Sequence, residues 1–190
     1  MTPFNRLVSP VVLHPVPDTD TDQIIPARFV NVQGQAALDQ ALFANLKAAD
    51  PNFVLNDPAM RGRQILLGGR NFGCGSSREA AAWALAAAGI RAVLAPSFNT
   101  TFWTNCVNNG LLPVAVDAQV HGELCAAAVR DAGLQVEIDL EACELRAPAA
   151  GIAASFVIEA FARELLLSGQ DELGYLLARQ DAIRAFATSH

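Results

Sequence analysis

The stretch from residue 64 to residue 116 constrains the fold most, because short apolar runs alternate in it with helical segments. We expect strands at 64–69, 91–95 and 111–116, and helices between them at 78–88 and 101–109. Strands that are joined through a helix in this way run parallel and are linked by right-handed crossovers. The pattern therefore predicts an α/β domain with a central, mostly parallel sheet.

The other segments extend this domain on both sides. Before residue 64 we expect a strand at 7–14, a helix at 35–46 and an irregular stretch at 51–63. After residue 116 we expect a helix at 120–132, strand-like pieces at 135–140 and 155–158, and a helical C-terminus at 159–187 interrupted near Gly169. The only linker-like text is the alanine-rich segment 147–154, so we predict a single domain over residues 1–190.

Composition excludes several classes of protein. Apolar residues make up 52% of the chain and charged residues 17%, which is far too apolar for a disordered segment. The longest apolar run, 80–90, falls short of the roughly 18 residues of a membrane span. Thirteen basic against nineteen acidic residues give a net charge of −6 without a basic cluster, so we expect neither a nucleic-acid partner nor a membrane.

The cysteines predict no metal site in this chain. They are Cys74, Cys106, Cys125 and Cys143, and no two form the C-x-x-C pair that begins many zinc and iron–sulfur sites. The first residues also lack the basic and apolar regions of a signal peptide. A cytoplasmic chain with reduced thiols is therefore expected.

The glycine-rich loop 68–79 is the best candidate for a functional site. It follows the carboxyl end of a predicted parallel strand and leads into a helix, which is where open α/β sheets bind ligands and where helix N–H groups attract anions. Gly73 and Gly75 would let the backbone approach a ligand closely. The competing interpretation is a capping box, in which Ser76 and Glu79 only cap the helix.

Well-known motifs do not fit this loop. It has no lysine, so it is not a P-loop, and Arg78 stands where a dinucleotide-binding loop needs its third glycine. A nucleophilic Cys74 would need a histidine nearby. The histidines are scattered singly, and we interpret them as incidental: His14, His121 and His190.

Two further loops are expected at the same edge of the sheet. Segment 18–22 contains three aspartates, which are otherwise typical of a solvated Asx turn. Segment 97–103 follows the next strand and would otherwise be a helix cap with packed aromatic residues. Together the three loops predict a site for a small polyanion, held by Arg78 and helix N–H groups near a serine and a carboxylate.

Four segments, in this order, resemble the small subunits of bacterial 3-isopropylmalate dehydratase, a family of the aconitase superfamily. They are Asp20-Thr-Asp-Gln-Ile-Ile-Pro, Asn71-Phe-Gly-Cys-Gly-Ser-Ser-Arg-Glu, Ala95-Pro-Ser-Phe and Asn108-Asn-Gly-Leu-Leu-Pro-Val. Residues 181–183 also fit the ending of the family, so the resemblance covers nearly the whole chain. It is the combination of segments that makes the resemblance specific.

The resemblance implies a swivelling β/β/α domain and a hydro-lyase reaction. In this family a separate large subunit holds the [4Fe–4S] cluster, the small subunit holds no cofactor, and the active site forms only between the two. The substrate is a small 2-hydroxy dicarboxylate. Dehydration and rehydration interconvert 2- and 3-isopropylmalate in leucine biosynthesis.

The resemblance also assigns roles to individual residues. Ser76 would be the catalytic base, acting as an alkoxide, and Asp22 matches the catalytic acidic loop. Arg78 would bind a substrate carboxylate through two hydrogen bonds. Ser77 is placed among the substrate-binding residues, and Arg28 is the candidate for a second carboxylate contact.

Two departures from the family keep alternatives open. Ala80 replaces the usual histidine, and segment 31–35 is unlike the usual forms. One alternative is a paralogous small subunit for citramalate, dimethylmalate or homocitrate, and another is a non-catalytic binding domain. Four aromatic residues near the loops would form the surface that contacts the large subunit: Phe72, Phe98, Phe102 and Trp103.

Overall fold

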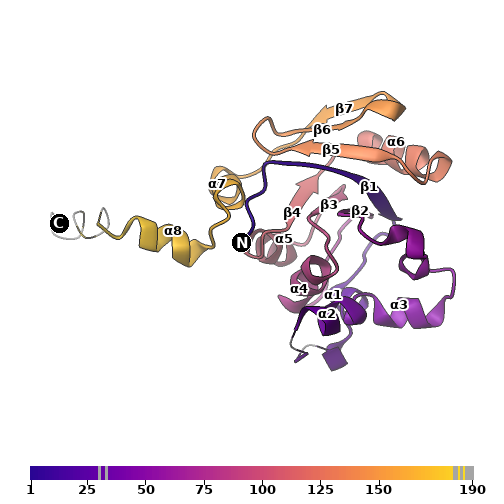
Figure 1. Ribbon diagram of the computed structural model, residues 1–190, viewed down its shortest axis with the longest axis horizontal. Helices are drawn as coiled ribbons and strands as arrows, with labels where there is room; N and C mark the ends of the chain where they lie inside the picture. The colour runs from indigo at the N-terminus through magenta and orange to yellow at the C-terminus, as the bar shows by residue number, and fades with distance from the viewer. Residues whose placement is uncertain (30, 33, 182–183, 185, 187–190) are drawn as a thin grey trace.

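The computed structural model describes residues 1–29, 31–32, 34–181, 184 and 186. Within these residues, seven strands form one sheet in the order β4-β3-β2-β1-β5-β6-β7 (Figure 1). The strands are β1 (Arg6–His14), β2 (Ile65–Gly68), β3 (Ala92–Ala95), β4 (Leu112–Ala115), β5 (Gln135–Asp139), β6 (Glu144–Ala147) and β7 (Ile152–Ser155). Neighbours from β4 to β1 are parallel and neighbours from β1 to β7 are antiparallel, so β1 to β4 and β6 all run in the same direction. The predicted α/β class with a mostly parallel sheet is confirmed.

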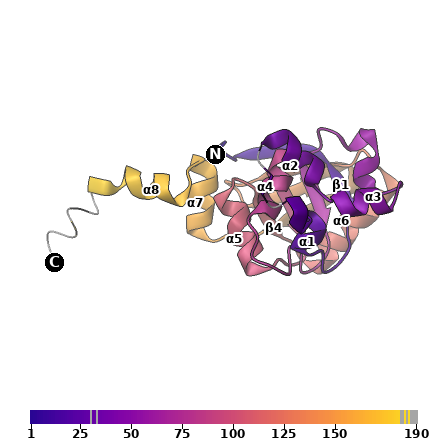
Figure 2. The same cartoon turned by 90° about the horizontal axis from the view of Figure 1, so that it is seen from below.

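Helices cover the sheet. The α-helices are α1 (Thr21–Ile24), α2 (Gln35–Ala41), α3 (Ala44–Ala49), α4 (Ala80–Ala87), α5 (Thr100–Asn108), α6 (Ala118–Arg130), α7 (Ala160–Ser168) and α8 (Glu172–Ala178). Short 3₁₀ turns are η1 (Ala27–Phe29), η2 (Val54–Asn56), η3 (Pro58–Met60) and η4 (Pro148–Ala150). Figures 1 and 2 show α8 projecting away from the body that the sheet and the other helices form.

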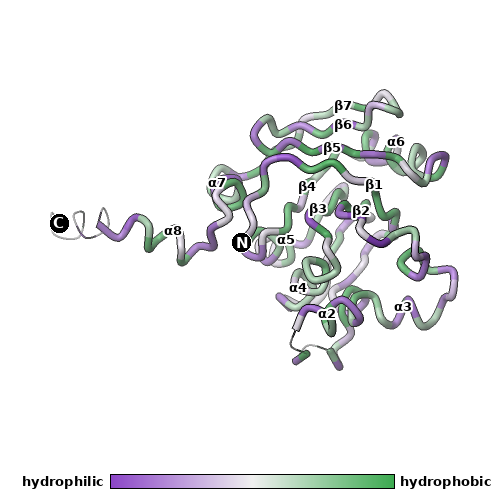
Figure 3. Tube along the Cα trace, in the orientation of Figure 1, coloured by the Kyte–Doolittle hydropathy of each residue, from purple (hydrophilic) through white to green (hydrophobic). Residues whose placement is uncertain are grey.

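Two packed cores lie on opposite faces of the sheet. Successive side chains of a strand point to opposite faces. Thus Ile65 and Leu67 lie in the first core, with residues of α6 and α7. Leu66 lies in the second core, with residues of α1, α2, α4 and α5. Figure 3 shows β3, β4 and α4 in hydrophobic green, which matches their burial between neighbouring elements.

Three expected elements were wrong in detail. The single helix at 35–46 is two helices, because Phe43 adopts a left-handed conformation (φ 50°), is fully buried, and donates its N–H to the carbonyl of Ile24. Strands β6 and β7 occupy much of the predicted linker 147–154, where Ala147 pairs with Ile152 and both are buried. Tertiary burial therefore overrides the local alanine-rich pattern. Strand β7 ends at Ser155, so only the first residue of the strand-like piece expected at 155–158 lies in a strand.

The helical C-terminus is confirmed as α7 and α8, with Gly169 at φ 68° between them. Phe161 of α7 and Tyr175 of α8 are in edge-to-face contact with ring centroids 4.9 Å apart. The last part of the predicted segment 159–187, and most of the family-like ending 181–183, lie outside the described residues. Among the residues that are described, no helix combines the length and the apolar character required to cross a membrane.

Candidate functional site

The loops after β1, β2 and β3 lie side by side at the carboxyl edge of the parallel strands. Beyond the strand ends, Asp20 forms a parallel bridge with Cys74, and Phe72 forms one with Phe98. The N–H of Thr21 donates to the carbonyl of Cys74 at 2.9 Å. The predicted convergence of the three loops is therefore confirmed.

The glycine-rich loop is held in place by packing against a buried aromatic ring. Gly73 has φ +73° and donates its N–H to the carbonyl of Thr19 at 2.8 Å, and a Cβ at this position would lie 2.1 Å from the ring of Phe102. Its lack of a side chain therefore serves packing against this ring. Gly75 (φ +91°) is exposed, and a Cβ there would lie 3.4 Å from that of Asp20. A close approach of Gly75 to a ligand remains a prediction.

Asp18 clamps the acidic loop to the glycine-rich loop. Its N–H donates to the carbonyl of Arg70 at 2.8 Å, and its carboxylate accepts a hydrogen bond from the side-chain amide of Asn71 at 2.8 Å. Both Asp18 and Asn71 have φ 56°, a left-handed conformation that these residue types tolerate. The N–H of Asn71 donates to Ser97 Oγ at 2.9 Å. These contacts tie all three loops together.

Asp22 and Arg78 form an ion pair between the acidic and the glycine-rich loop. One terminal nitrogen of Arg78 donates to Asp22 Oδ1, and the two side chains are 30% and 56% exposed, respectively. A guanidinium has five N–H donors. Arg78 can therefore remain paired with Asp22 and still present donors to a carboxylate. The structure brings together two residues that the sequence placed in one site.

Ser76 contacts Thr21 and does not cap the helix. Thr21 Oγ1 lies 3.1 Å from both the carbonyl oxygen and Oγ of Ser76. The helix that follows begins at Ala80, and its N-cap residue, Glu79, makes no side-chain capping bond. The capping-box interpretation of Ser76 and Glu79 was therefore wrong, as was a helix start at Arg78. The tertiary contact with Thr21 holds Ser76 in the loop instead.

A capping box does exist, but in the acidic loop. Asp20 Oδ1 accepts from the N–H of Gln23 at 2.7 Å, and Gln23 Oε1 accepts from the N–H of Asp20 at 3.0 Å. The spacing of an Asp and a Gln three residues later was the available sequence signal. Of the three aspartates, Asp20 is thus committed to α1, Asp18 to the clamp, and Asp22 to Arg78.

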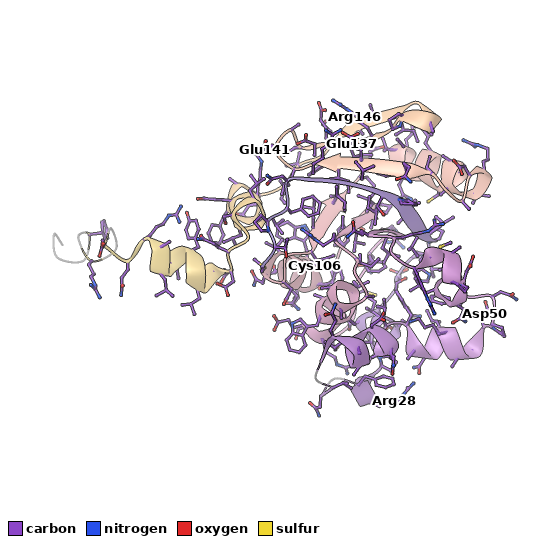
Figure 4. All side chains as sticks on the ribbon, in the orientation of Figure 1. Arg28, Asp50, Cys106, Glu137, Glu141 and Arg146 are labelled. Atoms are coloured by element: carbon purple, nitrogen blue, oxygen red, sulfur yellow. The ribbon has the colours of Figure 1, made fainter. Side chains whose placement is uncertain are left out.

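The other two predicted site residues lie apart from these contacts. Ser77 is exposed on the loop between Ser76 and Arg78. Arg28 donates to the side-chain carbonyl of Asn45 at 2.7 Å, and its guanidinium carbon lies 4.5 Å from the ring centroid of Phe29. In Figure 4 Arg28 lies at the outer edge of the fold near α2. The structure therefore directs Arg28 toward α3, and its proposed substrate contact remains a prediction.

The aromatic residues expected at a subunit surface are mostly internal. Phe72 and Phe102 are 0% and 2% exposed and pack edge to face with centroids 5.6 Å apart. That part of the expectation was wrong, because the glycine-rich loop folds down onto these rings. Phe98 and Trp103 are half-buried. Asn99 caps α5 by accepting from two backbone N–H groups, so the loop combines a helix cap with packed aromatic residues, the alternative that the sequence had left open.

The surroundings of two cysteines keep their thiols protonated more strongly than usual. Cys74 lies in the site loop, where partial burial raises the pKa of its thiol and the nearby carboxylates of Asp20 and Asp18 raise it further. Burial raises the pKa of the Cys106 thiol well above its ordinary value, because this residue lies inside the second core (Figure 4). Within the described part of the chain, no three Cys, His, Asp or Glu side chains are placed to hold a metal ion.

Two of the histidines have structural contacts. His14 is buried, and its Nε2 lies 3.3 Å from Thr19 Oγ1. His121 Nε2 donates to the carbonyl of Gly68 at 2.7 Å. Both side chains thus have partners inside the fold, and the interpretation that they are incidental stays a prediction. His190 lies outside the described residues.

Comparisons with known proteins find relatives over nearly the whole chain. The family model of the aconitase C-terminal domain matches residues 12–119. The 3-isopropylmalate dehydratase small subunit of Herpetosiphon aurantiacus is 42% identical over 190 residues, covering 100% of this chain and 95% of that protein. The one of Anaeromyxobacter dehalogenans strain 2CP-1 is 46% identical over 191 residues, covering 98% and 97%. The crystal structure of 3-isopropylmalate dehydratase from Methanocaldococcus jannaschii matches with a TM-score of 0.72 and 28% identity, over 96% of this chain and 99% of that one.

Proposed function

This chain belongs to the aconitase C-terminal domain family and, within it, to the 3-isopropylmalate dehydratase small subunits, and from this premise we propose how it acts. It forms half of a hydro-lyase that converts 2-isopropylmalate to 3-isopropylmalate in leucine biosynthesis. Residues 1–190 act as one swivelling domain that completes the active site of a large subunit in the cytoplasm. The four free thiols favour that reducing compartment.

The single observation that supports this role most is the joined pair of loops. The acidic loop and the glycine-rich loop are connected through Asp22–Arg78 and Thr21–Ser76 at the carboxyl edge of the sheet. One anion-binding side chain and one exposed hydroxyl are thereby held close together. An anion-binding group and a proton acceptor are two of the groups that a dicarboxylate undergoing loss of water requires from a protein.

The reaction assigns a task to each of these residues. Arg78 binds one carboxylate of the substrate through its remaining N–H donors, and Asp22 fixes the guanidinium in place. Ser76 Oγ, as an alkoxide, takes the proton from the carbon beside a carboxylate, and the electron pair left behind expels the hydroxyl of the neighbouring carbon as an alkene forms. Return of the proton to the carbon that lost the hydroxyl, and of hydroxide to the carbon that lost the proton, gives the isomer. Ser77 is positioned on the same loop to bind substrate.

The cofactor belongs to the partner in this proposal. The cysteines of this chain lie on separate elements and offer no set of thiolates for an iron–sulfur cluster. A [4Fe–4S] cluster in the large subunit would supply a Lewis acid for the departing hydroxyl. The relatives are named small subunits, which implies a large-subunit partner.

Reconstitution tests the proposal. The chain is mixed anaerobically with a cluster-bearing large subunit and assayed with 2-isopropylmalate, citramalate, dimethylmalate and homocitrate. We expect turnover of 2-isopropylmalate above the others by the pair, and none by the chain alone. Preference for another diacid would indicate a paralogue, inactivity of the pair on all four would indicate a binding domain, and turnover by the chain alone would refute the two-subunit site.

A further inference from the structure

Thr21 has a buried hydroxyl aimed at the proposed base. The residue is 1% exposed at the start of α1, and its Oγ1 lies 3.1 Å from the carbonyl oxygen and 3.1 Å from Oγ of Ser76. Its N–H is occupied by the carbonyl of Cys74. The backbone of Thr21 is therefore fixed by Cys74, and its hydroxyl lies within hydrogen-bond distance of two oxygens of Ser76.

A hydroxyl has one hydrogen to donate and two lone pairs. While Ser76 carries its proton, Ser76 Oγ can donate to Thr21 Oγ1, and Thr21 donates to the carbonyl of Ser76. Once Ser76 Oγ is an anion it can only accept. The hydrogen of Thr21 then reaches it by rotation about a single bond, with no movement of the heavy atoms.

We propose that Thr21 is a positioning residue that holds Ser76 Oγ in one orientation and stabilises its deprotonated form by donating a hydrogen bond to it. When Ser76 Oγ takes a proton from the substrate carbon, the Thr21 hydrogen returns to the Ser76 carbonyl. This inference rests on the proposed function, in which Ser76 is the base. The sequence does not reveal it, because the contact joins residues that are 55 positions apart.

Thr19 provides a matched control two residues earlier. It is also a buried threonine of the acidic loop, but its hydroxyl donates to the carbonyl of Val16 at 2.9 Å and lies 3.3 Å from His14 Nε2. Replacing it by valine removes a buried hydroxyl without touching Ser76. The charged and titratable groups of the loops around Ser76 stay the same in every variant: Asp20, Asp22, Cys74 and Arg78.

The kinetic test compares Thr21→Val, Thr21→Ser and Thr19→Val in the complex with the large subunit. We expect Thr21→Val to lower kcat by about 10²-fold with little change in KM, as the loss of one donor to a reacting oxyanion does. The rise of kcat with pH should shift to higher pH, because the serine anion has lost its donor. Thr21→Ser should restore most of the rate, and Thr19→Val should keep the wild-type pH profile.

A second measurement does not depend on activity. In the full-length chain alone, three-bond couplings at Ser76 should report one χ1 rotamer in the wild type and in Thr21→Ser, and an average of rotamers in Thr21→Val. An unchanged rotamer, an unchanged pH profile, or equal damage from Thr21→Ser would overturn the role of Thr21. If the wild-type complex is inactive on every substrate, the proposed function fails, and the rotamer measurement still decides whether Thr21 positions Ser76.

Discussion

Replacing Gly73 by alanine tests whether the site loop is supported by the second core. A Cβ at Gly73 would lie 2.1, 2.4 and 2.6 Å from three ring carbons of Phe102. Carbon atoms prefer separations of about 3.5–4.0 Å, so the ring would have to move by more than about 1 Å. It has little room to do so, because Phe102 is 2% exposed and stacks on Phe98 and against Phe72.

The expected cost has two parts that a control separates. A left-handed φ costs an alanine about 1–2 kcal/mol, and overpacking a core costs a further ~1–3 kcal/mol. Gly73→Ala should therefore lower the free energy of unfolding by about 2–5 kcal/mol. Gly89→Ala, at φ +86° with no atom within 4 Å of the added Cβ, should lose only the first part.

Urea unfolding of both variants gives the difference directly. A double-mutant cycle with Phe102→Leu adds a second check, because the smaller side chain makes room for the new methyl group. The combined loss should then be smaller than the sum of the two single losses. Equal costs for Gly73→Ala and Gly89→Ala, or strict additivity in the cycle, would refute the idea that the ring of Phe102 supports the loop.

Three further outcomes follow from the site and the buried histidine. Ser76→Ala should lower kcat about 10²–10⁴-fold while changing the free energy of unfolding by less than about 1 kcal/mol, because the residue is exposed and caps no helix. A loss of stability with normal turnover would return Ser76 to a structural role. Arg78→Lys should raise KM at least about tenfold, since a point charge cannot replace a planar fork, and unchanged kinetics would remove Arg78 from the site. Burial lowers the pKa of His14, so the folded state favours the neutral ring, and the free energy of unfolding should fall as the pH drops below about 6.5. His14→Phe should flatten this pH dependence in urea unfolding from pH 7.5 to 5.5. An unchanged dependence of the free energy of unfolding on pH would contradict the role given to His14.

Much of the fold follows from the sequence because local pattern and topology agree in its central part. The strand at 65–68 and the helix at 80–87 lie within their predicted ranges, since buried apolar strands and alanine-rich helices are locally consistent. Phe43 shows where this reasoning stops. Its left-handed conformation divides one helical pattern into α2 and α3. The N–H of Phe43 donates to the carbonyl of Ile24, which lies outside this helical segment, so the local pattern could not indicate the break.

The site was predictable to the level of loops but not of contacts. Parallel strands place the ends of β1, β2 and β3 at one edge, so Asp22, Ser76 and Arg78 could be assigned to one place. The contacts between side chains of different loops depend on the path that each loop takes beyond its strand. The sequence does not show that path, so the contact of Thr21 with Ser76 was missed. Ser76 and Glu79 have the spacing of a capping box, but the hydroxyl of Ser76 contacts Thr21 instead of the helix.

The charges at the loop edge also bear on why a partner is needed. Arg78 is compensated by Asp22 and Arg70 is paired with Asp18 at 3.4 Å, so the ion pairs that join these loops sum to zero charge. A dicarboxylate brings two negative charges to a chain whose net charge is already −6. Arg78 can orient one carboxylate, but its attraction is offset by the neighbouring aspartate. A second source of positive charge would therefore strengthen binding. In the proposed complex the large subunit supplies it, together with Arg28 if its predicted carboxylate contact forms, and this chain contributes orientation and the proton acceptor.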